Sequence, residues 1–285
     1  MRKILTLFIL SLVVFNGALC LSACNSDNKI TSPPIGESTQ ALPSNDEIAT
    51  PLIPITPPES SSGKIENKEN TPSQELEYAS YLSSNTNNLN IRSSSSTSGK
   101  KLGSINKGDM LSYEGMEGNW YRTIFKEQTA YVHKDYVTII KIKKTSESVE
   151  KVINVGLSLL GHPYVYGSER YHWGNGKLNY NFVPGKFDCS ALMQYVFYFG
   201  SDTLLEVTSK KQFYQGADVD ELKRGDLMFF TNANGYNASG INRVRHVGMY
   251  LGDNYILHTA SDYAVIEPIS TKRWEYFITA RRILD

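Results

Sequence analysis

The spacing of apolar and polar residues changes several times along the chain, and each spacing predicts a different kind of element. From about residue 86 to 140, short alternating runs are separated by turn residues, as in LNIRSSS, KLGSINKGDMLSYEG, NWYRTIF and TAYVHKDYVTII. Alternation places every second side chain on one face of a strand, and several short strands in succession are typical of a small barrel. This segment therefore predicts a β-barrel.

Helical spacing begins after the barrel segment. Apolar residues recur at helical intervals in SESVEKVINVGLSLLGHP, where Ser146 is a suitable N-cap and Gly161 and Pro163 end the pattern. A second helix is predicted at DCSALMQYVFYFGS, which is apolar on nearly every side and therefore belongs in the middle of a domain. Two later runs, RHVGMYLG and YILHTAS, predict neighbouring strands joined by a tight LGDN turn.

The beginning of the chain predicts export. Residues 1–24 have a basic start, an apolar run from Ile4 to Phe15 and small residues ahead of Cys24, a pattern of a secretory signal and not of a membrane span. The ending Leu-Ser-Ala-Cys resembles the lipobox of bacterial lipoproteins, which implies lipidation of Cys24. An ordinary cleaved signal that ends near a cysteine is the alternative. Two acyl chains on Cys24 would anchor the protein stably to a membrane.

Composition separates a tether from the folded part. Residues 25–78 hold eight of the eleven prolines, many Ser, Thr and Asn residues and no periodic apolar face, which predicts a disordered tether. The whole chain has 29 basic and 29 acidic residues, so its charge gives no reason to expect a nucleic-acid partner. Residues 79–285 have 24 basic and 20 acidic residues, a mild excess that is compatible with an anionic wall.

Cys189 is the only cysteine of the predicted folded part. Cys20 would leave with the signal and Cys24 would carry lipid, so Cys189 has no intramolecular partner although an exported protein is permitted disulfides. Such a thiol is either a small buried hydrophobe or a nucleophile. Cys189 lies at the first turn of the second predicted helix, where unpaired N–H groups and the helix dipole favour a thiolate. We therefore expect a lowered thiol pKa there.

A cysteine nucleophile needs a base, and two histidines follow in the predicted strand pair. His246 and His258 could present one imidazole to the sulfur and the second imidazole to the first. Each histidine alone is more often structural, and His133, His162 and His172 are given that structural interpretation. No spacing of these residues suggests a zinc site, and no cofactor is expected.

Taken together, these motifs resemble the NlpC/P60 family of papain-like cysteine peptidases. GHPYVYG, FDCSAL, TSKKQFYQGADVDELKRGDLMFF, HVGMYLG and YILHTA follow in the order of that family. The resemblance implies an α+β catalytic domain at 144–285. Residues 79–143, with NLNIRSSSSTS, KGD, GNWYRTIF and AYVHKDYV, resemble a bacterial SH3 domain, which implies a module that binds peptidoglycan or positions its neighbour. Its aromatic residues fit a ligand groove or plain barrel core equally well.

The family resemblance implies a role for six residues. Cys189 would be the nucleophile, His246 the general base and acid, and His258 the residue that orients His246. Tyr164 would lie beside the sulfur and help to hold the oxyanion. Asp188 and Ser190 would bind the amino terminus of a peptidoglycan stem peptide.

The chain also departs from the family pattern. Tyr166 stands where a tryptophan is usual, and Ala191 replaces a glycine. The stretches 168–186 and 231–245 are longer than usual. Both insertions either rim the cleft or are neutral surface decoration.

The sequence as a whole predicts a monomeric cell-wall hydrolase outside the cytoplasm, held to the membrane by a lipid anchor. The implied substrate is a peptidoglycan stem peptide, cut between D-glutamate and a diamino acid by Cys189, His246 and His258. A related papain-like amidase that cuts between sugar and peptide is one alternative. A wall-binding lipoprotein with a vestigial catalytic domain is the other.

Overall fold

The computed structural model describes residues 77–174, 176–259 and 262–285. The predicted signal, the lipidation site at Cys24 and nearly all of the predicted tether lie outside these ranges. Within these ranges, no helix is both long enough and apolar enough to cross a membrane.

The first part of the described chain forms short antiparallel strands, as the alternation of apolar residues predicts. In β2, Leu89 and Ile91 are buried while their neighbours are half-exposed, and Ala130 and Val132 repeat this pattern in β7. The elements of this part are β1 (Tyr78–Ser84), β2 (Leu89–Arg92), β3 (Lys101–Ile105), β4 (Met110–Ser112), β5 (Met116–Glu117), β6 (Trp120–Phe125), β7 (Gln128–His133), η2 (Lys134–Tyr136) and β8 (Val137–Lys143).

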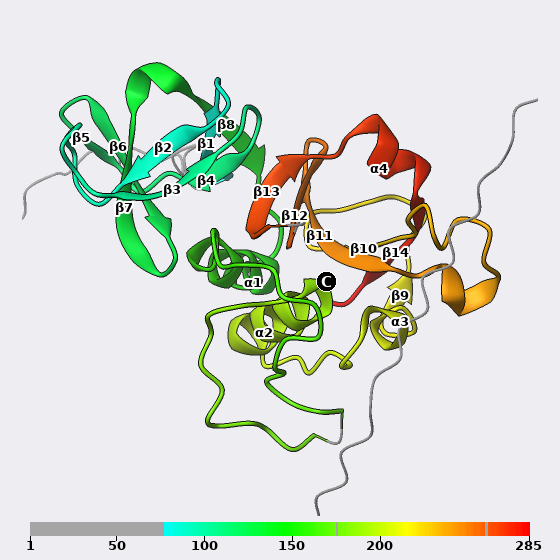
Figure 1. Ribbon diagram of the computed structural model, residues 1–285. Helices are drawn as coiled ribbons and strands as arrows, with labels where there is room; N and C mark the ends of the chain where they lie inside the picture. The colour runs from blue at the N-terminus through cyan, green and yellow to red at the C-terminus, as the bar shows by residue number, and fades with distance from the viewer. Residues whose placement is uncertain (1–76, 175, 260–261) are drawn as a thin grey trace, which may run out of the picture. The chain divides into compact units, whose positions relative to one another are not determined.

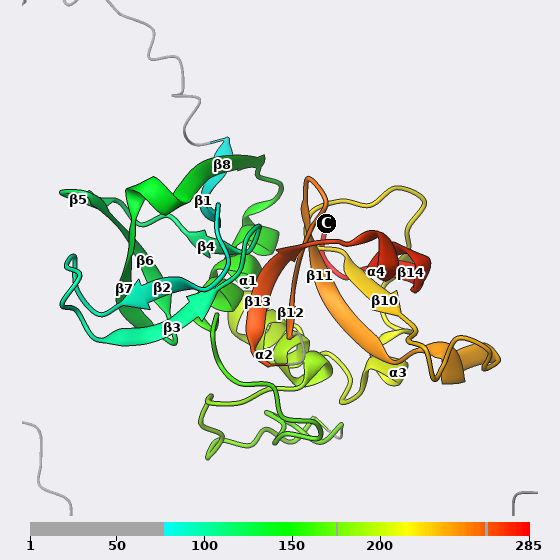
Figure 2. The ribbon, with the colours of Figure 1, turned by 45° about the horizontal axis from the view of Figure 1, so that its top comes forward.

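The second part combines helices with a sheet. Its elements are α1 (Glu147–Ser158), α2 (Cys189–Ser201), α3 (Ser209–Gln212), β9 (Ala217–Asp218), β10 (Leu227–Phe230), η3 (Gly240–Arg243), β11 (His246–Gly252), β12 (Tyr255–Thr259), β13 (Ala264–Pro268), α4 (Thr271–Glu275) and β14 (Phe277–Arg282). α1 and α2 pack on each other, and α2 also lies against β11 and β12 (Figures 1 and 2). The predicted α+β class is confirmed.

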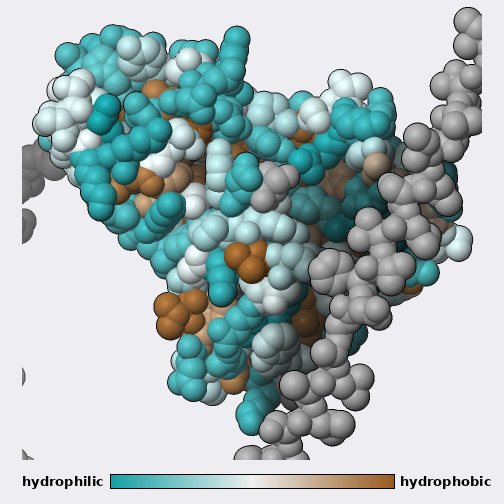
Figure 3. Space-filling view, viewed as in Figure 1, coloured by the Kyte–Doolittle hydropathy of each residue, from teal (hydrophilic) through white to brown (hydrophobic). Residues whose placement is uncertain are grey.

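The two long helices approach each other closely because a glycine lies between them. A Cβ atom on Gly200 of α2 would lie 2.4 Å from the Cα of Val152 in α1, so a side chain at this position would push the helices apart. Most of α2 is buried, including Leu192, Met193 and Val196. On the face drawn in Figure 3 the surface is mainly hydrophilic, with apolar residues in separate spots. The apolar character of this helix therefore builds the core, as predicted.

Strands of the first part continue the sheet of the second part. Among the described residues, a nine-stranded sheet has the order β8-β1-β4-β13-β12-β11-β10-β14-β9, and a five-stranded sheet has the order β3-β2-β7-β6-β5. The junction is the pairing of Met110 in β4 with Ile266 in β13. The sequence predicted a small barrel over residues 79–143, and three strands of this part, β8, β1 and β4, extend the sheet of the second part.

Candidate active site

Cys189 is the first residue of α2, and the cap of that helix positions it. Asp188 has the extended backbone of an N-cap, with φ −92° and ψ 177°, and its Oδ1 accepts a hydrogen bond from the Ala191 N–H at 2.9 Å. Phe187, just ahead of this cap, is held by the GHPYVYG segment at residues 161–167. The Phe187 N–H donates to the Pro163 carbonyl at 3.1 Å, and the Val165 N–H donates to the Phe187 carbonyl at 3.0 Å. The thiol is thereby held at a helix start, 8% exposed.

The strand pair that carries both histidines forms as the sequence predicts. β11 and β12 are antiparallel, with Met249 opposite Leu257. They are joined at Asp253 and Asn254, which have φ 47° and 66°, values that tight hairpin turns require and that Asp and Asn tolerate. His246 begins β11, and the fully buried His258 lies within β12.

Three polar side chains form a continuous hydrogen-bonded chain behind the predicted base, His246. His246 Nε2 lies 2.8 Å from His258 Nδ1, and His258 Nε2 lies 3.1 Å from Glu267 Oε1. Arg273 Nη2 donates to the same Glu267 oxygen at 2.8 Å. Burial raises the pKa of Glu267, but His258 and Arg273 lower it more, so its pKa is lowered overall and the carboxylate is charged.

This chain of contacts determines where the protons lie. A carboxylate only accepts, so His258 donates from Nε2 to Glu267 and its neutral ring accepts at Nδ1. His246 must then donate from Nε2, which leaves its Nδ1 as an acceptor. Burial, followed by the charges of His258 and Arg273, holds the pKa of His246 well below 6.5. Near neutral pH, His246 is therefore an unprotonated base at Nδ1.

The environment of Cys189 corrects one expectation. Burial raises the pKa of the thiol to about 11, the Asp188 charge adds to this, and the hydrogen bonds of the Val247 and Ser190 backbone N–H groups lower it only in part. The predicted lowering of this pKa by the helix start was wrong, because the loss of water around the sulfur outweighs the dipole. Since Val247 follows His246, its effect on the pKa of Cys189 is consistent with a sulfur close to the start of β11.

A cleft of about 630 Å³ opens at this strand start and is lined by Tyr164, His246, His258 and Glu267. The pKa of Tyr164 is raised by burial and then by Cys189, so its phenol keeps its proton and remains a donor. The wall of the cleft is basic, and its further residues are Phe230, Thr231, Asn232, Arg245, Thr259, Ser270, Lys272, Arg273 and Tyr276. Thr231, Asn232 and Arg245 belong to the second insertion, which therefore rims the cleft.

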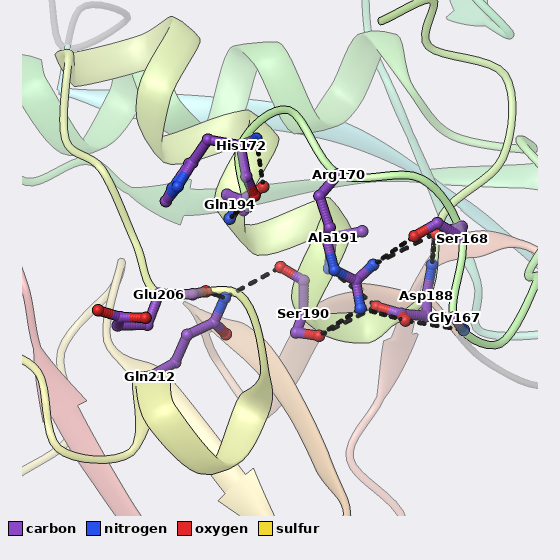
Figure 4. Close-up of polar contacts among 10 residues, drawn as sticks. All are labelled: Gly167, Ser168, Arg170, His172, Asp188, Ser190, Ala191, Gln194, Glu206 and Gln212. Atoms are coloured by element: carbon purple, nitrogen blue, oxygen red, sulfur yellow. Dashed lines mark hydrogen bonds and ion pairs between the residues drawn. The ribbon is translucent and has the colours of Figure 1, made fainter. Parts of the chain in front are cut away.

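Asp188 and Ser190 flank Cys189 in the sequence, and both are buried. Their side chains pair with Arg170 of the first insertion, at 2.6 Å from Asp188 Oδ2 and 3.4 Å from Ser190 Oγ (Figure 4). His172, in the same insertion, contacts the Leu205 carbonyl through Nε2 at 2.8 Å. That contact agrees with its structural interpretation from the sequence.

Sequence reasoning missed Glu267, Arg273 and Arg170. Glu267 could have been predicted from the sequence. β13 pairs with β12 and puts Glu267 opposite Ile256, so that it lies diagonal to His258 on the same face of the sheet. Pairing the predicted strand that contains His258 with the segment that follows it would have placed Glu267 near His258. No comparable signal exists for Arg170, which reaches Asp188 through an irregular segment.

Comparisons with known proteins agree with the two family resemblances predicted from the sequence motifs. The NlpC/P60 family matches residues 161–282, and the bacterial SH3 domain matches residues 87–138. The peptidoglycan endopeptidase RipA of Mycolicibacterium smegmatis is 31% identical over 137 residues, which cover 47% of this chain and 26% of that protein. The gamma-D-glutamyl-L-lysine dipeptidyl-peptidase of Bacillus subtilis is 29% identical over 147 residues, covering 51% and 42%.

The solved structures include an NlpC/P60 family protein from Bacillus cereus, 23% identical, with a TM-score of 0.39 and coverage of 73% of this chain and 64% of that one. The chain spans less than half the length of the two curated relatives named above.

Proposed function

We propose that this chain, which matches the NlpC/P60 family over residues 161–282 and a bacterial SH3 domain over residues 87–138, is a cell-wall hydrolase in which Cys189 attacks peptidoglycan stem peptides. One observation carries the proposal. His246, His258 and Glu267 form a hydrogen-bonded chain around the fully buried His258, and this chain leaves His246 Nδ1 as a base. The backbone N–H of the next residue, Val247, lies near enough to Cys189 to lower the pKa of its thiol.

The reaction begins with the thiol and a neutral imidazole, not with a preformed ion pair. Because the pKa of Cys189 is about 11 and that of His246 is well below 6.5, the proton must move from sulfur to His246 Nδ1 as the sulfur attacks the carbonyl carbon. His258 and Glu267 stabilise the positive charge that then forms on His246. The same two residues prevent the His246 ring from turning.

The next steps use donors near the sulfur. The Tyr164 hydroxyl and backbone N–H groups at the start of α2 are the candidate donors to the oxyanion. His246 then returns its proton to the leaving amine as the C–N bond breaks, which leaves a thioester on Cys189. Water, deprotonated by His246, hydrolyses the thioester, releases the acid and restores the thiol.

The proposed substrate is a stem peptide cut between D-glutamate and a diamino acid. Arg245, Lys272 and Arg273 give the cleft a basic wall, and such a wall favours the carboxylates of an acidic peptide. The similarity to two relatives, a peptidoglycan endopeptidase and a gamma-D-glutamyl-L-lysine dipeptidyl-peptidase, supports the same substrate class. The proposed place of action is the wall side of the membrane, with Cys24 as the lipid anchor.

Digestion of defined muropeptides, followed by mass spectrometry, tests this function. We expect products that differ by hydrolysis between D-glutamate and the diamino acid. Release of the intact peptide from its sugar would instead identify an amidase. Unchanged substrates at high enzyme concentration would identify a wall-binding protein with a vestigial site.

A further inference from the structure

The carboxylate of Asp188 is fully engaged by groups of the chain itself. Oδ1 accepts from the Ala191 N–H at 2.9 Å and from Ser190 Oγ at 3.0 Å. Oδ2 accepts from the Gly167 N–H at 3.1 Å and from Arg170 Nη2 at 2.6 Å. Figure 4 shows these donors converging on Asp188, which is 4% exposed. No face of the carboxylate is left for a ligand.

Arg170 is held as firmly as its partner. Its Nη1 donates to the Ser168 carbonyl at 3.0 Å and approaches Ser168 Oγ at 3.4 Å. The ion pair is buried on both sides, with side-chain exposures of 7% for Arg170 and 6% for Asp188. A charged pair with these hydrogen bonds is costly to open, since separation would leave an uncompensated charge away from water.

The pair changes what this side of the nucleophile can recognise. The family resemblance implies that Asp188 and Ser190 bind the positively charged amino terminus of a stem peptide. Here a guanidinium from the insertion 168–186 already occupies both residues. The neutralised carboxylate offers no charge to an incoming ammonium group, and that ammonium group would have to displace Arg170.

We infer that Arg170 takes the place of the substrate ammonium, so that this enzyme does not require a free amino terminus and cleaves stem peptides whose first residue is acylated. Such peptides are those still joined to the glycan. The inference rests on the proposed function and narrows its substrate class. The enzyme would act on the polymeric wall before any amidase has freed the peptide, not on released peptides afterwards.

Two synthetic peptides test this inference directly. Both contain L-alanine, γ-linked D-glutamate and a diamino acid, and one carries an acetyl group on its amino terminus. For the full chain we expect comparable kcat/KM on both peptides. Cleavage of the free-amine peptide alone overturns the inference but leaves the proposed function intact. Cleavage of neither peptide overturns the proposed function, and the inference with it.

Variants of Arg170, assayed on the same two peptides, provide a second test of the inference. Arg170→Ala exposes the charge of Asp188, so the ratio of kcat/KM for the free-amine peptide over the acetylated one should rise about tenfold or more. Arg170→Lys keeps a cation beside Asp188 and should keep the wild-type ratio. An unchanged ratio in a folded Arg170→Ala protein overturns the inference.

The controls separate recognition from folding. Arg170→Ala combined with Asp188→Asn leaves no unpaired charge at the start of α2, so this variant should fold and show no gain in amine preference. A gain in this double variant would contradict the assigned role of Asp188. Arg282→Ala breaks a similar pair, with Asp226 at 2.8 Å, whose members do not line the cleft, and it should leave the ratio unchanged.

Discussion

At the scale of single residues, the site depends on which ring nitrogens of His246 and His258 carry the protons. His246 can accept a proton at Nδ1 only because its Nε2–H is donated to His258, and His258 is set to accept only because Glu267 takes its own Nε2–H. Glu267 is thus a positioning residue that acts through two imidazoles. The sequence predicted both histidines from their strand motifs, but the carboxylate depends on the pairing of β12 with β13.

Glu267→Gln tests this arrangement. The new amide can donate to His258 Nε2, which would reverse both tautomers and put a proton on His246 Nδ1, where the base is needed. We expect kcat/KM to fall by about 100-fold or more. Because the pKa of His246 is well below 6.5, the wild-type enzyme should keep its activity as the pH falls to 6.5 and lose it only below that. The variant should be weaker at every pH.

The matched control is Glu147→Gln, which removes an exposed carboxylate paired with Lys151 at 2.7 Å, away from the cleft, and should leave kcat/KM unchanged. A Glu267→Gln enzyme with wild-type kcat/KM would show that the tautomers do not depend on Glu267. The same conclusion would follow if the variant only shifted the acidic side of the curve of kcat/KM against pH and kept the wild-type value at the plateau of that curve.

At the scale of elements, the hairpin between β6 and β7 completes helix α1. The Glu127 N–H donates at 2.9 Å to the carbonyl of Ser158, the last residue of α1, and the Lys126 N–H donates at 2.9 Å to the carbonyl of Leu160, just beyond the helix. These carbonyls have no partner within the helix, so the hairpin supplies their hydrogen bonds. The Phe125 ring packs against Gly161 at the same place.

Gly161→Ala should loosen this contact. A Cβ atom there would lie 2.2 Å from the Phe125 ring, at a backbone φ of +88° that favours glycine. We expect a loss of about 1–3 kcal/mol in the free energy of unfolding, measured by denaturant titration. Gly118→Ala is the control, since Gly118 also has a positive φ, +59°, but open space around it. Equal losses in the two variants would mean that the packing against Phe125 contributes nothing.

Elements with strong local patterns were predictable, and contacts between distant segments were not. The α2 helix and the β11–β12 hairpin follow from apolar spacing and from the LGDN turn. The pairing of Met110 with Ile266 has no local signal, because it joins residues far apart in the sequence. The raised pKa of Cys189 was missed for the same reason: the helix start is local, whereas burial comes from the whole fold.

At the scale of the whole molecule, the two described parts contribute to the same large hydrophobic cluster, while a smaller cluster of Met228, Phe230, Ile256 and Ile269 lies within the second part. One hydrophobic cluster contains Tyr81 and Leu111 from the first part together with Val152 and Leu257 from the second part. Arg224 adds a polar link, since it pairs with Glu150 at 2.7 Å and donates to the Tyr81 hydroxyl at 2.6 Å. The part that matches the bacterial SH3 domain is therefore joined to the part that matches the NlpC/P60 family through the sheet, the large cluster and an ion pair.

A shared core predicts joint unfolding. Thermal unfolding of residues 77–285, followed by calorimetry, should give a single transition whose calorimetric and van't Hoff enthalpies agree. Residues 144–285 alone should lose cooperative unfolding, because the cluster would be cut. Two separate transitions in residues 77–285 would contradict this expectation and would favour an SH3 domain that only binds the wall.

The proposed anchor belongs to the same scale. Cys24→Ala removes the thiol that the Leu-Ser-Ala-Cys ending predicts to be lipidated, so the full chain should move from the membrane fraction to the soluble fraction. Cys20→Ala is the matched control and should leave the protein in the membrane fraction. If Cys24→Ala leaves partitioning unchanged, and no lipid mass is found on the mature amino terminus, the chain has no such anchor.

The central claim is that Cys189 attacks the stem peptide with His246 as its base, and turnover of one defined muropeptide by matched variants tests it most directly. Cys189→Ala and Cys189→Ser should retain the circular dichroism spectrum of the wild type and lose about 10⁴-fold or more in kcat. His246→Ala should be nearly as severe, and combining it with Cys189→Ala should add little, because base and nucleophile act as one unit. Cleavage of the muropeptide that survives Cys189→Ala in a folded protein would contradict the account.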